Sequence, residues 1–308
     1  MATTDVVVFS SSPEPGTVDP GGRGQPAATL IGSTSIFLWA VWPALAVYSS
    51  PAPTFQILAT GMTIGFLALA ALRIGRGEPL SGMLPKSWGL LLAGVVGILG
   101  TNTFNFIAVT RISPAQASVI AYLWPIIALV LAGALGLKRL QSKHYVAVVL
   151  GFVGAVFVIN PFTGMELDFI GILCAFLAGL SFAAYTTYRL VDSRSASDAV
   201  GIYGLISAII CAALHFGIEK TQSLNATQIA AVVVLGLAPM GLANAVWDYG
   251  VARGDARALS VLAYGTPLVA TFLLVFLGLA DITPTLIIGA LLIVGAAAIG
   301  TWPARSEP

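Results

Sequence analysis

The chain has 308 residues, of which 57% are hydrophobic and only 9% charged, and its formal net charge is +1 at pH 7. Soluble domains carry about 25% charged residues. This composition therefore excludes a soluble globular protein and a disordered one, because neither could keep so much apolar surface from water. The near-neutral charge also argues against a nucleic-acid-binding protein.

The segment 1–26 differs from the rest of the chain. It is rich in Ser, Pro and Gly and lacks apolar periodicity. A secretory signal peptide would combine a basic start, an apolar stretch and a small-residue cleavage site, and that pattern is not visible. We expect a disordered cytoplasmic tail here and a second, short cytoplasmic tail at 303–308.

From residue 27 onward, apolar segments alternate with short connectors that contain Gly, Pro and Ser. Each segment is long enough to cross a hydrocarbon core of about 30 Å. Barrel strands would be about ten residues long with alternating polarity, so we predict helices. The fold class is an all-α integral membrane protein with ten transmembrane helices, at 27–48, 53–72, 88–108, 114–136, 144–160, 167–188, 199–218, 227–250, 257–279 and 284–302.

The Lys and Arg residues predict the orientation of these helices. With ten spans, all but two of the 14 Lys and Arg residues fall on one side of the membrane, and only Arg111 and Lys220 fall on the other. Cytoplasmic loops carry an excess of Lys and Arg. We therefore expect a multi-pass protein of the bacterial inner membrane with both termini in the cytoplasm.

The two halves of the chain contain an internal repeat. The third and fourth spans resemble the eighth and ninth at an offset of 142 residues, and matches at Arg, Asn, Tyr and Pro carry more weight than matches at Leu or Val. The matched pairs are Arg111 and Arg253, Asn102 and Asn244, Ser118 and Ser260, Tyr122 and Tyr264, Pro125 and Pro267, and Gly136 and Gly278.

This repeat predicts two five-helix units, at 27–160 and 167–302. An odd number of spans in each unit turns the second copy upside down relative to the first. Inverted repeats are an architecture of secondary transporters, whose substrate sites lie near the membrane midplane between the halves.

The same residues resemble the drug/metabolite transporter superfamily, in its ten-helix form with two EamA-type repeats. The resemblance covers residues 27–302 and includes the segments 122–125 (Tyr-Leu-Trp-Pro), 264–267 (Tyr-Gly-Thr-Pro) and 247–255. The Tyr-Leu-Trp-Pro box is similar to one in bacterial aromatic amino acid exporters. The resemblance implies a secondary transporter that works by alternating access.

Polar and aromatic side chains deep inside the spans are the candidate site, since polar groups are costly in a membrane. The aromatic alternative is an interfacial belt, which we assign to Tyr48, Trp88, Tyr145 and Trp302. For the Asn residues, the alternative is a hydrogen bond between helices. The candidate substrate-binding residues are Trp39, Trp42, Asn102, Tyr122, Tyr185, Asn244, Trp247 and Tyr264, and the candidate hinges or kinks are Pro125 and Pro267.

Asp168 stands in the first turn of the sixth predicted span, and Asp248 is the only other carboxylate inside a span. It could carry a proton or meet a substrate ammonium group. It also lies about one turn from the end of the span, where it could pair with Arg253 or Arg257. We favour the second, structural role. The isolated residues His144 and His215 are assigned no function.

The leading function is export of small amphipathic metabolites, with aromatic amino acids as the best candidate substrates, from an aromatic cavity with few hydrogen-bonding groups. Export of cationic drugs or other metabolites stays open, because aromatic side chains also bind cations. An intramembrane enzyme is the remote alternative, since the spans contain no H-E-x-x-H motif and no aspartate pair. The sequence has no G-x-x-x-x-G-K-[ST] motif, so we do not expect it to use ATP. Cys174 and Cys211 make no metal-binding spacing, and we expect no metal and no other cofactor.

Overall fold

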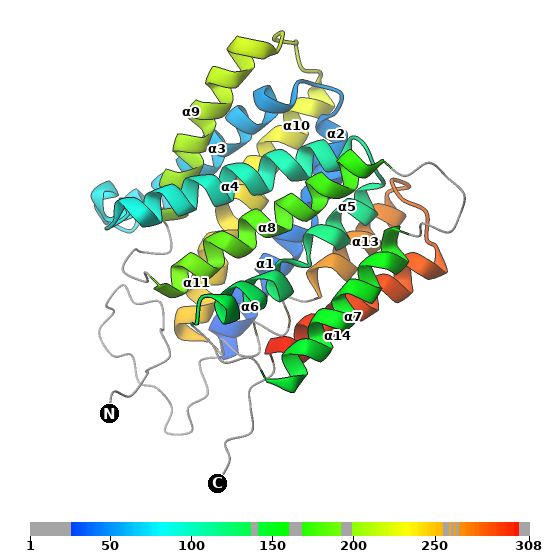
Figure 1. The fold of residues 1–308 in the computed structure, drawn as a ribbon. Coiled ribbons are helices and arrows are strands. Elements are labelled where there is room, and N and C mark those ends of the chain that lie inside the picture. Colours follow the sequence, from blue (N-terminus) through cyan, green and yellow to red (C-terminus); the bar gives the residue numbers. More distant parts are fainter. Residues whose placement is uncertain are drawn as a thin grey trace, which may run out of the picture.

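The computed structural model describes residues 26–136, 141–159, 168–191, 199–254 and 265–301, together with residues 259 and 262. Every regular element within these ranges is helical (Figure 1). Each of the ten apolar segments predicted from the sequence contains at least one helix. In chain order they are α1 (Pro26–Ala40), α2 (Trp42–Ser49), α3 (Thr54–Gly75), η1 (Leu80–Met83), α4 (Trp88–Val109), α5 (Pro114–Ala121), α6 (Trp124–Ala134), α7 (Ser142–Ile159), α8 (Phe169–Val191), α9 (Val200–Ile218), α10 (Ala226–Leu235), η4 (Gly236–Leu242), α11 (Ala243–Arg253), α13 (Thr266–Phe276) and α14 (Pro284–Thr301).

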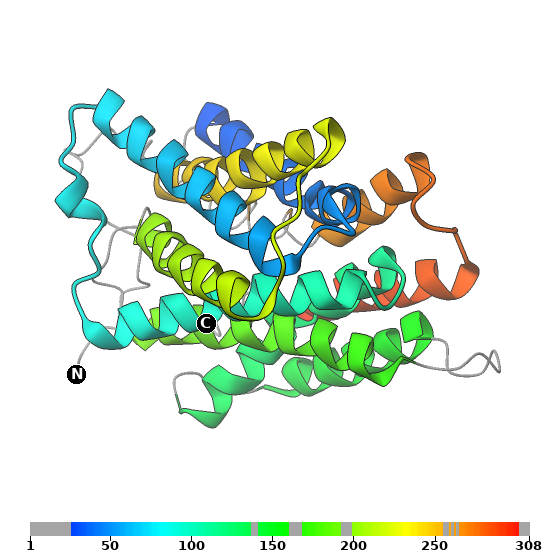
Figure 2. The same ribbon diagram turned by 90° about the horizontal axis from the view of Figure 1, so that it is seen from above.

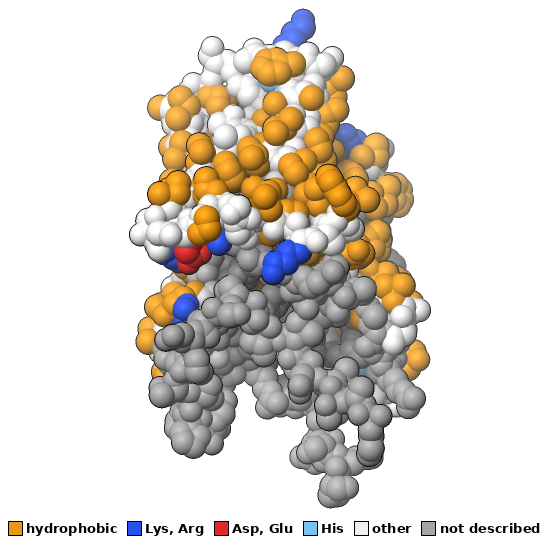
Figure 3. Space-filling model, turned by 90° about the vertical axis from the view of Figure 1, so that its left-hand side faces the viewer, with side chains coloured by type: hydrophobic (Ala, Val, Ile, Leu, Met, Phe, Trp, Pro, Cys, Tyr) orange, Lys and Arg blue, Asp and Glu red, His pale blue; other side chains and the backbone are white. Residues whose placement is uncertain are grey.

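The lengths and compositions of these helices are those of a membrane protein. Among the described residues, seven helical stretches are long and apolar enough to cross a bilayer, and three shorter apolar helices accompany them, at Ser142–Val158, Thr266–Phe276 and Pro284–Ile299. Figure 3 shows hydrophobic side chains gathered in a broad band, with charged side chains toward its two ends. Hydrocarbon-facing surfaces have this pattern, because a charge is costly at membrane depth.

Side chains at the starts of several helices cap them. Ser87 accepts the Leu90 N–H at the start of α4, and Asn225 forms a capping box with Gln228 at the start of α10. Asp168 accepts the Gly171 N–H at 2.8 Å before α8 and forms an ion pair with Arg111. The Gly171 N–H, with Arg111 beside it, lowers the pKa of the Asp168 carboxyl below its usual value. These caps satisfy N–H groups that a helix start leaves free.

The helices of the first half pack on those of the second. α7 packs on α14, α4 on α8, α3 on α9, α1 on α11, and α5 on α13. Figure 1 shows α7 and α14 side by side, and Figure 2 shows α8 lying along α4. The buried core lies where these pairs meet and includes Ile57, Phe106, Val119, Leu235 and Leu274.

The repeat is visible in the backbone. α6 and α13 each have 11 residues, and both ends of α13 lie 142 positions after those of α6, which is the offset found in the sequence. Soon after each helix comes a glycine in the left-handed region, Gly136 with φ 70° and Gly278 with φ 69°. Glycine adopts this conformation without the strain that a Cβ would cause.

Glycines let paired helices approach closely. A Cβ on Gly289 of α14 would stand 2.6 Å from the Gly154 carbonyl oxygen of α7, and one on Gly250 of α11 would stand 2.5 Å from the Gly32 Cα of α1. Real Cβ atoms do not come so near to backbone. Such contacts hold membrane helices together by van der Waals packing, because apolar burial gives little drive between helices in lipid.

We expect Gly289→Ala to destabilise the protein by about 1–3 kcal/mol, because α7 and α14 must separate to admit the methyl group. Gly295→Ala on the same helix is the matched control, since a Cβ there would meet nothing within 4 Å. Thermal unfolding in detergent micelles compares the two. Equal melting temperatures for the two variants would contradict the close α7–α14 contact.

Candidate functional site

Three spans are interrupted next to a proline. The first span breaks at Val41, the fourth at Tyr122 and Leu123, and the ninth at Gly265. In each case a new helix follows with proline at its first or second position, in α2, α6 and α13. Proline cannot donate a backbone hydrogen bond and suits the start of a helix. The candidate hinges Pro125 and Pro267 therefore stand where a helix restarts, rather than in the middle of a continuous one.

The breaks in the fourth and ninth spans have the same geometry. The Leu123 N–H donates to the Ile120 carbonyl at 3.0 Å, and the Gly265 N–H donates to the Leu262 carbonyl at 2.8 Å. Both bonds tighten the chain into a turn of the 3₁₀ type, and both partners are displaced by the repeat offset of 142. Pro267 is buried; the side chain of Pro125 lies outside the described part of the chain.

The two breaks meet between the halves of the molecule. The Tyr122 hydroxyl forms a hydrogen bond with the side chain of Thr266, and Thr266 is fully buried. Thr266 occupies the position in the second repeat that Trp124 occupies in the first. Tyr122 thus ties the broken fourth span to the start of α13.

The eighth span is irregular in a different way. η4, between α10 and α11, is a π-helix and contains the buried Pro239. It packs against α3, where Gly61 and Gly65 bring the two backbones together. Short π-helical segments are rare and occur often at functional sites. η4 sets the direction of α11, which carries Asn244 and Trp247.

Trp39 and Trp247 form the first contact between candidate residues. Their ring centroids are 5.5 Å apart and the planes are tilted by 53°. The pair lies where α1 packs along α11. Both side chains are partly buried. Indole rings at this separation present an apolar, polarisable surface on which another aromatic ring can pack.

Trp42 and Asn102 form the second contact. The indole Nε1 of Trp42 donates to Oδ1 of Asn102 at 3.2 Å. The Nδ2 of Asn102 donates in turn to the Ile98 carbonyl at 2.8 Å, within α4. The Trp42 ring meets Phe106 edge-on, with centroids 5.7 Å apart. One amide therefore orients an aromatic residue from another span, and its second Nδ2 hydrogen can serve a further partner.

Tyr185 belongs to a separate aromatic group. Its ring lies 6.2 Å from Phe182 and 6.0 Å from Tyr203, which is fully buried on α9. Phe182 also contacts Trp124 edge-on at 4.9 Å. Tyr185 thus packs with the α4–α8–α9 cluster, whereas the contacts of Trp39 and Trp42 join α1, α2, α4 and α11.

Of the other candidate residues, the structure describes the side chain of Asn244 but not those of Tyr264 and Asp248. Asn244 donates to the Met240 carbonyl at 3.4 Å, a long bond within its own span. Tyr264 lies outside the described residues, and so does the side chain of Asp248.

Sequence reasoning missed Glu219. Both oxygens of its carboxylate accept the Phe55 N–H at 3.1 Å at the start of α3, and Oε2 also pairs with His215 at 2.9 Å. His215 Nε2 lies 2.9 Å from the Thr221 hydroxyl. The carboxylate caps α3 and so holds the end of α9 against it. No spacing in the sequence indicates this contact, because 164 residues separate Glu219 from Phe55.

Comparison with known proteins identifies the class of protein. The EamA-like transporter family matches residues 27–160 and again 169–301. The chain belongs to the EamA-like transporter family. It is a multi-pass membrane transporter of the drug/metabolite superfamily with two EamA repeats, and not an enzyme, which confirms the resemblance inferred from the sequence.

Individual relatives cover nearly the whole chain. The aromatic amino acid exporter YddG of Ancylobacter novellus is 34% identical over 284 residues, which are 91% of this chain and 98% of that protein. The aromatic amino acid exporter YddG of Escherichia coli is 23% identical, over 87% of this chain and 94% of that one. A solved crystal structure with 32% identity superposes with a TM-score of 0.70 and covers 89% of this chain and 97% of its own.

We expect Trp39→Ala to lower transport at least about tenfold without loss of expression, because truncating a central aromatic contact commonly costs 2 kcal/mol or more of binding energy. Trp88→Ala is the matched control, since Trp88 is 85% exposed at the start of α4 and should act only as an interfacial anchor. Initial rates in proteoliposomes of equal protein content measure both. Equal rates for the two variants would remove Trp39 from the site.

Proposed function

We propose that this transporter exports aromatic amino acids from the cytoplasm by alternating access around a site between two inverted five-helix repeats. The observation that carries the proposal is the pair of contacts Trp39–Trp247 and Trp42–Asn102, which bring aromatic rings and one amide together from the first, third and eighth spans. Such a surface suits a solute with a flat apolar ring and a small polar end.

The charged end of the substrate needs partners as well. The start of an interrupted helix presents the positive end of the helix dipole, and transporters use broken helices in this way to meet substrate carboxylates. The starts of α6 and α13, where Tyr122 and Thr266 meet, provide two such places. We propose that one of them receives the substrate carboxylate while the indoles receive the ring.

The inverted arrangement accounts for the packing of the helices. A two-fold relation between the halves exchanges the first span with the sixth, the second with the seventh, and so on. It maps the pairs α3–α9, α5–α13 and α7–α14 onto themselves and exchanges α4–α8 with α1–α11. The five helix pairs named above are consistent with this relation. Ten crossings, with both termini in the cytoplasm of an inner-membrane protein, complete the proposal.

Aromatic amino acid exchange is tested by counterflow in proteoliposomes. Vesicles loaded with unlabelled phenylalanine should accumulate labelled phenylalanine, tyrosine and tryptophan, while labelled lysine and leucine should enter no faster than in protein-free vesicles. The physical reason is that a flat ring packs on paired indoles better than an aliphatic or cationic chain does. The name of the Ancylobacter novellus relative points the same way.

The alternative substrate class gives a different result in the same vesicles. If aromatic amino acids fail to exchange while a lipophilic organic cation such as tetraphenylphosphonium does, the protein is an exporter of cationic drugs, since aromatic side chains also hold cations. That outcome would overturn the proposed substrate.

The proposed topology predicts the location of three connectors. A reporter fused after Ala52 or after Asp281 should read as external, and one fused after Lys138 as cytoplasmic, because twelve of the 14 Lys and Arg residues then lie on the cytoplasmic side. Paired alkaline phosphatase and green fluorescent protein fusions make the measurement. A cytoplasmic signal at either of the first two positions would contradict the ten-span arrangement.

A further inference from the structure

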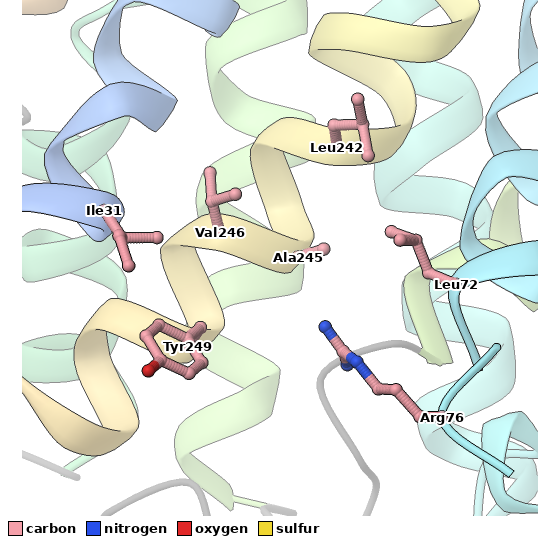
Figure 4. Close-up of a pocket in the computed structure, with 7 residues that line it drawn as sticks. All are labelled: Ile31, Leu72, Arg76, Leu242, Ala245, Val246 and Tyr249. Carbon is pink, nitrogen blue, oxygen red and sulfur yellow. The ribbon is translucent and has the colours of Figure 1, made fainter. Parts of the chain in front are cut away.

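A narrow groove lies between α3 and α11, away from the paired indoles. Its volume is about 240 Å³, and it is open on one side. Figure 4 shows the lining side chains of α1, α3 and α11 turned toward this space, with the guanidinium group of Arg76 reaching across its lower part. The lining residues are Ile31, Leu72, Arg76, Leu242, Ala245, Val246 and Tyr249.

Helix packing creates the groove. Gly61 and Gly65 bring α3 against η4, whereas α11 runs along α1 instead of α3. The helices α3 and α11 therefore separate beyond η4, and the small side chain of Ala245 leaves the space between them unfilled (Figure 4). Ile31 is 42% exposed, so one wall of the groove faces outward.

In the described part of the chain, the charged side chains at the mouth of the groove are both arginines, Arg76 and Arg253. Arg76 follows the last residue of α3, and in the described part of the chain its side chain makes no ion pair or hydrogen bond. Arg253 lies over the Tyr249 ring, with its Cζ 4.8 Å from the ring centroid. The other lining side chains are aliphatic. The groove thus combines apolar walls with a guanidinium group that has no anionic partner among the described residues.

We propose that this groove binds one acyl chain of an anionic phospholipid, with the lipid phosphate on Arg76. A linear alkyl chain suits a narrow, aliphatic space that is smaller than the 300–1,000 Å³ of most drug-sized pockets. Guanidinium pairs with phosphate through two parallel hydrogen bonds. Basic pockets between membrane helices on the cytoplasmic side commonly bind anionic lipids.

The position favours a lipid over the transported solute. By the proposed topology, which this inference uses only to name the leaflet, Arg76 lies at the cytoplasmic membrane surface. The exposed Ile31 and Leu72 would then face hydrocarbon rather than water. Among the described lining residues, a zwitterionic amino acid would meet a cation but no carboxylate for its ammonium group, since the walls are aliphatic apart from Tyr249. A bound lipid would brace α3 against α11, which carries Trp247.

Lipid retention measured by native mass spectrometry tests the proposal without any transport assay. Purified full-length protein in detergent micelles is titrated with dioleoylphosphatidylglycerol or with dioleoylphosphatidylcholine, which has the same chains but no net charge. We expect preferential retention of phosphatidylglycerol, and Arg76→Gln should weaken its binding at least about fivefold. Arg76→Lys should keep most of the preference. Lys220→Gln, which removes an exposed cation at the other end of the molecule, should change nothing.

Filling the groove separates chain binding from charge. Ala245→Leu keeps Arg76 but occupies the space, and should weaken retention of both lipids to a similar degree. Size-exclusion chromatography and melting temperature establish that each variant is folded, and Ala245→Leu keeps the test decisive if Arg76→Gln is not folded.

Three results would overturn the proposal. The first is equal retention of phosphatidylglycerol by the wild type and Arg76→Gln. The second is competition by glycerol phosphate, which has the head group without chains, at concentrations similar to those of the lipid; this would indicate a site for soluble anions. The third is displacement of the lipid by phenylalanine, which would make the groove part of the transport path. None of them depends on whether counterflow of aromatic amino acids is observed.

Discussion

A bilayer core offers no water to the peptide backbone, so each N–H and C=O group within it must find a partner in the protein. In most of the described chain, unbroken helices supply these partners for the backbone. In the described residues the breaks before α6 and α13 are short turns that keep hydrogen bonds of their own. The turn before α6 keeps its hydrogen bond from Leu123 to Ile120, and the equivalent turn before α13 keeps one from Gly265 to Leu262. Irregular backbone at membrane depth is tolerated only inside the protein or beside a cavity, so these breaks mark the interior that a transporter needs.

The same demand explains why the polar groups are few and shared. Trp42 and Asn102 satisfy each other across two spans, and Tyr122 joins Thr266 across the two halves. The described contacts of the candidate site are otherwise between aromatic rings, Trp39 with Trp247 and Trp42 with Phe106. A site of this kind desolvates an aromatic ring at little cost and uses a small number of directional contacts to select the polar end. Because Tyr122–Thr266 and Trp39–Trp247 connect the halves, a rearrangement of the halves would change these contacts, as the proposed alternating access requires.

The sequence was sufficient to predict the helices, because about twenty apolar residues without a charge can do little else in a membrane. It also predicted the repeat, which α6 and α13 reproduce at the offset of 142. The sequence could not show whether a proline bends a helix or interrupts it. Proline indicates only that one backbone hydrogen bond is lost, and the packing of the neighbouring spans determines which other bonds form. The π-helix η4 was missed for the same reason, because its extra residue leaves no mark on hydropathy.

Contacts between distant spans were the hardest to predict. Trp39 and Trp247 were both candidates, but their pairing depends on the crossing of α1 and α11 at Gly32 and Gly250. Tyr185 was placed with the same group, yet its ring packs with Phe182 and Tyr203. Periodicity assigns residues to faces of one helix, whereas the distance between faces follows from the packing of whole helices.

The central claim is that an aromatic solute binds between the two halves, against the indoles of the first and eighth spans. A crystal structure of the protein with a bromine-substituted tryptophan tests it most directly, because anomalous scattering locates the bromine independently of the protein. The account predicts a single strong peak beside Trp39 and Trp247, within reach of Asn102. A peak only at the groove near Arg76, or at the lipid-facing surface, would contradict it.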